Sequence, residues 1–191
     1  GVLNAIFYLS ALDRIQIDAN KVLMISLFLI VMIEIMIGGR VIPSFTANAF
    51  FGLKQVRNKN FSTLVLASCG ISFLLWIFSP FSLITAIACL FTGVIQFTLL
   101  WGWRPFATFA KPIVLVLHAA YFWIPLGFIL LGLSALGLVT IYVPVHAFGI
   151  GATAGLIIGM ITRTAMGHTG RQLIAGAIEI LSYSLVQATA I

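Results

Sequence analysis

The sequence predicts an all-α fold: a polytopic transmembrane helix bundle of about six spanning helices, preceded by a partial N-terminal helix. Of its 191 residues, 62% are hydrophobic and 7% are charged, whereas soluble domains carry about 25% charged residues. The mean hydropathy is +1.19, and the apolar runs recur at the length of about 20 residues that crosses a bilayer. These observations exclude soluble, disordered and fibrous proteins, and we expect one transmembrane domain over residues 1–191.

The N-terminal third contains one complete span. Residues 1–12 are typical of the end of a helix, and the polar segment 13–21 forms a hinge. The first complete span covers residues 22–37. Glycine and proline at 38–43 end or kink it. The apolar segment 44–53 is too short to span, so we expect it to be interfacial or re-entrant.

Proline and glycine also delimit the later spans. Ser79 and Pro80 separate the second span from the third. Pro112 occupies a favourable first-turn position of the fourth, and Pro125 kinks that helix. Residues 167–170 form the turn before the last span. The later spans are expected at about 61–78, 81–101, 112–133, 145–162 and 172–191, with an apolar link at 139–144.

The basic residues orient these helices. Loops 38–60, 102–111 and 162–171 hold eight of the ten Lys and Arg residues, and loops 79–81 and 134–144 hold none. Because Lys and Arg mark the cytoplasmic side, the first three loops should be cytoplasmic. The charges are too sparse for a nucleic-acid-binding face. The net charge of +6 is therefore interpreted as orienting the chain in the membrane, with the lipid bilayer as its partner.

Ionisable residues inside a membrane are costly and mark candidate functional sites. Glu34 and Glu179 are each either a neutral acid hydrogen-bonded to a neighbouring helix or part of a functional path. The histidines are either interhelical hydrogen-bonders or metal ligands. His118 lies in the fourth span, His146 at the external start of the fifth, and His168 in the cytoplasmic turn after it.

Further donors are expected close in depth to His118. They are Arg40, Arg163, His168 and Arg171, all towards the cytoplasmic end. Such a group of donors calls for an anion, which would be a haem propionate, a phosphate or a lipid headgroup.

Small residues repeat every four positions in the fifth span and lead to Arg163. This stripe packs closely against another helix, or carries a flat macrocycle whose propionate binds Arg163, and the two can coexist. His146 lies 17 residues before Arg163, about 25 Å along a helix, so the two cannot contact one haem edge. The small residues are Ala147, Gly151, Gly155 and Gly159.

Cys69 and Cys89 lie near the middle of two neighbouring spans. They are either buried thiols, copper ligands or partners in a disulfide. No nucleophile elbow, P-loop or metalloprotease motif is present in the sequence. We therefore assign no catalytic residues, and the sequence does not indicate an enzyme.

Three stretches of sequence occur in a distinctive order. They are GGRVIPSFT at 38–46, LHAAY at 117–121 followed by LG at 126–127, and a region from HAF at 146–148 through MITR at 160–163 to GHTGR at 167–171. In this order and spacing they resemble the NnrS family of bacterial membrane proteins.

The resemblance implies a multi-pass protein of the bacterial inner membrane with about twice this number of helices. This chain would then be the C-terminal part, and an N-terminal half with further His motifs would complete the protein. The resemblance also implies haem b, copper and a role in the nitric oxide response. It carries over His118, His146 and His168 as haem or metal ligands, and Arg40, Arg163 and Arg171 as propionate or structural partners.

The first function expected is therefore a haem-binding protein that protects against nitrosative stress, with nitric oxide or a related small molecule as ligand. The alternative is an ion- or proton-coupled transporter without haem, favoured by Glu34, Glu179 and the kinked helices. An oxidoreductase needs two redox centres, and the sequence offers too few well-placed ligands for them. A purely structural subunit without cofactor or substrate is a fourth hypothesis for the function.

Overall fold

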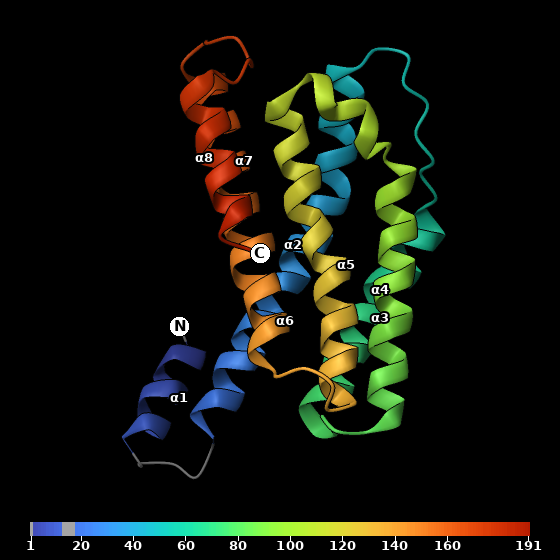
Figure 1. Ribbon diagram of the computed structural model, residues 1–191, viewed down its shortest axis with the longest axis vertical. Helices are drawn as coiled ribbons and strands as arrows, with labels where there is room; N and C mark the ends of the chain where they lie inside the picture. The colour runs from blue at the N-terminus through green and yellow to red at the C-terminus, as the bar shows by residue number, and fades with distance from the viewer. Residues whose placement is uncertain (1, 13–17) are drawn as a thin grey trace.

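The computed structural model describes residues 2–12 and 18–191, and every element in these residues is a helix (Figure 1). Five of the helices are long and apolar enough to cross a membrane, and one further apolar helix is shorter. The predicted all-α polytopic bundle is confirmed. The elements are α1 (Val2–Ala11), α2 (Ala19–Ala49), α3 (Lys59–Phe78), α4 (Leu83–Gly102), the 3₁₀ helix η1 (Pro105–Ala110), α5 (Pro112–Ala135), α6 (Tyr142–His146), the π-helix η2 (Ala147–Ala154), α7 (Gly155–His168) and α8 (Ala177–Ala188).

Helix α2 is longer than the sequence predicts. It runs for 31 residues, past the expected end at residue 37. Pro43 removes one helical hydrogen bond, but Ile42, Pro43 and Thr46 are buried and hold the helix against the bundle. The expectation that residues 44–53 form a separate interfacial segment is wrong, because Ser44–Ala49 completes α2.

The expected hinge lies partly outside the described residues, at positions 13–17. On its described side, Asp18 caps α2 by accepting a hydrogen bond from the backbone N–H of Asn20 at 2.9 Å. The expected N-terminal helix is present as α1, which packs against the start of α2 (Figure 1).

The fifth span consists of α6, η2 and α7 in succession, 27 residues in all. Its middle part is π-helical, and Thr153 Oγ1 donates a hydrogen bond to the carbonyl of Phe148 at 3.0 Å. The span therefore begins earlier and ends later than the predicted 145–162. Turns of π-helix are rare and often mark functional sites.

The last apolar segment is shorter than the expected sixth span. Residues 172–176 are not helical, and α8 has 12 residues, or about 18 Å, against a hydrocarbon core of about 30 Å. Glu179 accepts a hydrogen bond from the backbone N–H of Gly176 at 2.9 Å. This acid therefore caps its own helix.

Helix α5 lies at the centre of the bundle and contacts α2, α4, η2, α7 and α8 (Figure 1). Glycines permit the close approach of the fifth span. A Cβ added at Gly151 would lie 2.3 Å from Trp123 Cγ, and one at Gly159 would lie 2.8 Å from Leu117 Cδ2. The small-residue stripe is therefore covered by α5. The helix-packing interpretation is confirmed, and α5 occupies the face on which a macrocycle would lie.

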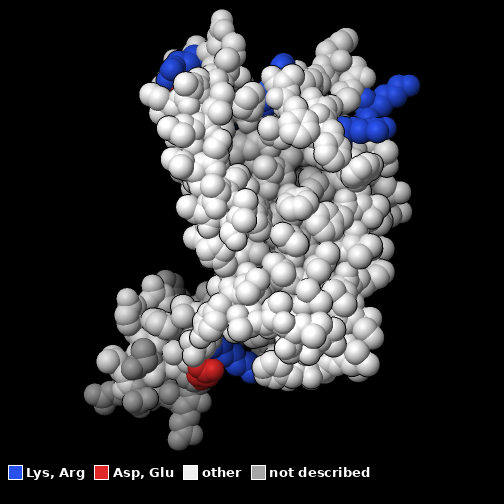
Figure 2. All heavy atoms as spheres, in the orientation of Figure 1, with Lys and Arg blue, Asp and Glu red and all other residues white. Residues whose placement is uncertain are grey.

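The basic loops lie at one end of the bundle. The α2–α3, α4–α5 and α7–α8 connections share the upper end in Figure 1, and the α3–α4 and α5–α6 connections share the lower end. Figure 2 shows most of the visible Lys and Arg side chains at that upper end, above a broad apolar surface. The assignment of this end to the cytoplasm stays a prediction.

We expect Gly151→Ala to destabilise the protein, because the new methyl group would overlap the Trp123 ring. Overpacking of this kind costs about 1–3 kcal/mol. Gly149→Ala is the matched control in the same π-helical segment, since a Cβ there meets nothing within 4 Å. Thermal unfolding in detergent measures both variants. Equal melting temperatures for the two would contradict the packing described here.

Candidate functional site at His118

His118 of α5 is buried, with 2% of its side chain exposed. Its Nε2 lies 2.8 Å from Thr46 Oγ1 on α2, and that hydroxyl lies 2.9 Å from the carbonyl oxygen of Ile42. A threonine hydroxyl has one hydrogen to donate, and the Ile42 carbonyl can only accept it. With that hydrogen on the Ile42 carbonyl, Thr46 accepts the hydrogen bond from His118, and Nε2 carries the proton of the neutral ring.

The second ring nitrogen of His118, Nδ1, is buried and has no hydrogen-bond partner. In this tautomer it holds a bare lone pair, which can accept a hydrogen bond or bind a metal. Histidines that ligate metals usually donate their other N–H to a protein acceptor, which fixes the ring. The arrangement of Thr46 and His118 therefore fits a metal ligand.

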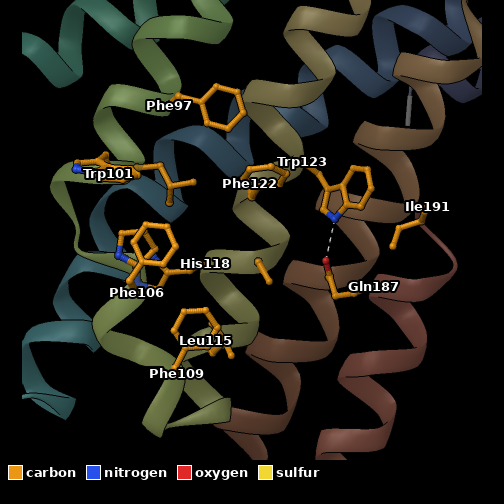
Figure 3. Close-up of a pocket in the computed structure, with 13 residues that line it drawn as sticks. Phe97, Trp101, Phe106, Phe109, Leu115, His118, Phe122, Trp123, Gln187 and Ile191 are labelled. Atoms are coloured by element: carbon orange, nitrogen blue, oxygen red, sulfur yellow. Dashed lines mark hydrogen bonds between the residues drawn. The ribbon is translucent and has the colours of Figure 1, made fainter.

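The His118 ring lines an apolar groove of about 540 Å³, which we call the aromatic groove. Such a volume is in the range of pockets that hold drug-sized ligands. Figure 3 shows η1 on one side of His118, and Gln187 and Ile191 of the C-terminal segment across α5. The aromatic side chains that line the aromatic groove are Phe97, Trp101, Phe106, Phe109, Phe122 and Trp123.

Local interactions hold the two walls of the aromatic groove. Arg104 adopts a left-handed conformation with φ 61 at the start of η1. The buried Trp103 ring lies 4.8 Å from the Tyr121 ring and 6.4 Å from the His118 ring, centroid to centroid. On the other wall, Trp123 Nε1 donates a hydrogen bond to Gln187 Oε1 at 2.8 Å.

A second buried polar cluster lies deeper in the bundle. The Tyr121 hydroxyl donates to Gln96 Oε1 at 3.1 Å, and Gln96 Nε2 donates to Cys69 Sγ at 3.1 Å. Cys69 and Cys89 are both free and buried, so the buried-thiol interpretation is confirmed against the disulfide. These bonds join α3, α4 and α5.

Glu34 of α2 faces the π-helical segment. Its carboxyl group lies near the side chain of Thr153, while its Oε2 is buried without a hydrogen-bond partner. Glu34 also lines a small cavity of about 160 Å³ between α2 and α7. The expected contact with a neighbouring helix is present, and one oxygen of the Glu34 carboxyl group lacks a hydrogen-bond partner.

The structure does not bring the predicted arginines to His118. Arg40 lines a separate groove between α2 and α3. The Arg163 guanidinium lies over the Phe45 ring, 3.9 Å from its centroid. Arg171 is exposed after the end of α7. None of the three lines the aromatic groove, and their role as propionate partners stays a prediction.

The other two histidines lie apart from His118. His168 is exposed at the last residue of α7. His146 is exposed at the other end of the fifth span, where its Nε2 lies 2.9 Å from the carbonyl oxygen of Thr189. Their role as ligands likewise stays a prediction.

Sequence reasoning missed two parts of this site. Thr46 lies in the GGRVIPSFT stretch, which marked the region without assigning this residue a role. The aromatic groove was not predicted, because its residues come from segments distant in the sequence.

A family model described as NnrS protein matches residues 1–191. The chain belongs to the NnrS family. Together with the five long apolar helices, membership of this family supports a multi-pass membrane protein of the nitric oxide response. A search of curated proteins and a search of solved structures found no match to the chain.

We expect Thr46→Val to lower the free energy of unfolding by about 1–3 kcal/mol, because it leaves the buried Nε2–H of His118 without an acceptor. Thr98→Val is the matched control. Thr98 also donates to the carbonyl four residues earlier, but it is exposed and has no histidine partner. Denaturation in detergent compares the two variants. Equal losses would show that the His118 contact contributes nothing.

Proposed function

We propose that this NnrS family member binds haem b in the bacterial inner membrane and protects against nitrosative stress. The observation that carries the proposal is the buried His118 Nδ1, which has no protein partner. Haem requires only one or two axial ligands from the protein. A single fixed imidazole beside an apolar groove meets that requirement.

The donor set favours haem over copper as the group at His118. Within residues 2–12 and 18–191, no group of three or more His, Cys, Asp and Glu side chains could hold a metal ion. Haem brings its own equatorial nitrogens, whereas copper sites take most of their ligands from the protein. Copper binding therefore remains the weaker half of the proposal.

Each part of the site has a defined task in this proposal. Haem iron, when bound, supplies direct coordination of nitric oxide. Thr46 fixes the ring of His118 and keeps its proton on Nε2. The aromatic side chains exclude water from the groove. Carboxylate groups of the ligand would meet the basic end of the bundle, for which Arg40, Arg163 and Arg171 remain candidates.

We expect His118→Gly to abolish the Soret absorption band of the purified full-length protein, because the axial nitrogen is removed. Added imidazole should restore the band, which separates loss of the ligand from loss of the fold. His146→Ala and His168→Ala test the other two predicted ligands in the same way. A Soret band that survives His118→Gly, or one that is lost only in the His168 variant, would overturn this assignment.

Glu34 favours a second candidate function, an ion- or proton-coupled transporter without haem. A carboxyl oxygen buried in a membrane helix without a partner is a candidate proton carrier. It lies beside a π-helical segment, whose Thr153 it contacts. The acid and the irregular backbone together resemble the coupling sites of transporters.

In that case, we expect Glu34→Gln to slow proton flux through vesicles that contain the purified protein by about tenfold or more. A pH-sensitive dye inside the vesicles follows the flux. Glu179→Gln is the matched control, because this acid caps α8. Absence of flux in the unaltered protein, or equal flux in the Glu34 variant, would rule out the transporter.

A further inference from the structure

A second groove lies between α2 and α3, with α4 behind it, and has a volume of about 430 Å³. We propose that this groove binds one anionic phospholipid, whose phosphate is held by Arg40 and Lys59. We call it the lipid groove. The lining residues used below are Ile35, Arg40, Lys59, Ser62, Thr63 and Leu66.

The lipid groove has one cationic end and one apolar end. Helices α2 and α3 run in opposite directions (Figure 1), so Arg40 lies beside Lys59 at one end, and Ile35 lies beside Leu66 at the other. Five residues of α2 and seven of α3 separate these ends, which corresponds to about 7–10 Å along the helices. The groove thus offers cations for a headgroup and an apolar wall for acyl chains.

The α2–α3 loop brings Lys59 down to the level of Arg40. Gln55 and Arg57 of the loop both donate hydrogen bonds to the carbonyl of Pro43. The loop therefore runs back along α2, and α3 begins below the end of α2 (Figure 1). Arg40 lies nine residues before the end of α2, about 13 Å, so it lies on the side of the helix rather than at its tip.

The cations of the lipid groove have no anionic partner among the described residues. The acids there lie elsewhere: Asp18 at the start of α2, Glu34 in another cavity and Glu179 at the start of α8. An exposed guanidinium without an acidic partner, near the basic end of a membrane bundle, attracts an anion from its surroundings. In a bilayer, that anion is a lipid headgroup, and basic pockets between spanning helices bind anionic ones.

The hydroxyl groups of the lipid groove do not supply further donors. Ser62 Oγ donates to the carbonyl of Asn58 and Thr63 Oγ1 to that of Lys59, each at 3.0 Å. Arg40 and Lys59 must therefore provide the attraction. Because two cations face one headgroup, a lipid with a net negative charge is favoured over a zwitterionic lipid.

The test measures binding of phosphatidylglycerol to the purified full-length protein by native mass spectrometry. Phosphatidylcholine and inorganic phosphate serve as comparison ligands. We expect Arg40→Gln and Lys59→Gln each to weaken phosphatidylglycerol binding by roughly fivefold. Arg40→Lys, which keeps the charge, should retain most of the binding.

Lys54→Gln is the matched control, because Lys54 is exposed at the same end of the bundle and does not line the groove. It should bind phosphatidylglycerol as the unaltered protein does. An equal loss in this control would show general charge attraction and overturn the site. Equal binding of phosphatidylcholine, or displacement of the lipid by inorganic phosphate alone, would also overturn it.

Discussion

The hydrogen bond between His118 and Thr46 is the interaction on which the candidate site depends. It joins α5 to α2 inside the apolar part of the bundle. When the Thr46 hydroxyl donates its one hydrogen to the carbonyl of Ile42, the bond to His118 also decides which ring nitrogen carries the proton. A contact that would otherwise only join two helices leaves Nδ1 bare and buried. The hydrogen bond that joins α5 to α2 is thus also the interaction that leaves a ring nitrogen of His118 available to a ligand.

The central place of α5 makes this possible. Glycines on the fifth span let α5 lie within van der Waals distance of its neighbours, as at Gly151 and Trp123. Helix α5 thereby covers the small-residue surface on which a flat macrocycle would lie. The open aromatic groove lies between α4, η1 and α5, and aromatic rings and the C-terminal segment line it. Close packing by glycines is also present between α4 and α5, at Gly93 and Gly132, so the groove is confined to the end of this helix pair that carries η1.

Much of the fold could be predicted from the sequence, because the length of each apolar run and the placement of Lys and Arg depend only on residues that are neighbours in the sequence. The continuation of α2 through Pro43 and the start of α8 at Ala177 rather than near residue 172 could not be predicted. Burial of Ile42 and Thr46 outweighs the lost hydrogen bond at Pro43, and that burial depends on distant residues. His118 was identified from its place in a membrane helix. Its separation from Arg40, Arg163 and His168 follows from the helix faces that they occupy, which shared depth alone does not determine.

The most direct test of the account is the protonation of His118 in the protein free of haem. Nitrogen-15 NMR of histidine-labelled protein distinguishes a protonated ring nitrogen from a bare one, and His118→Gln assigns the signals. The account predicts a neutral ring with the proton on Nε2 and a bare Nδ1. A proton on Nδ1 would contradict it, because Thr46 would then not be the acceptor and no lone pair would remain there for a ligand.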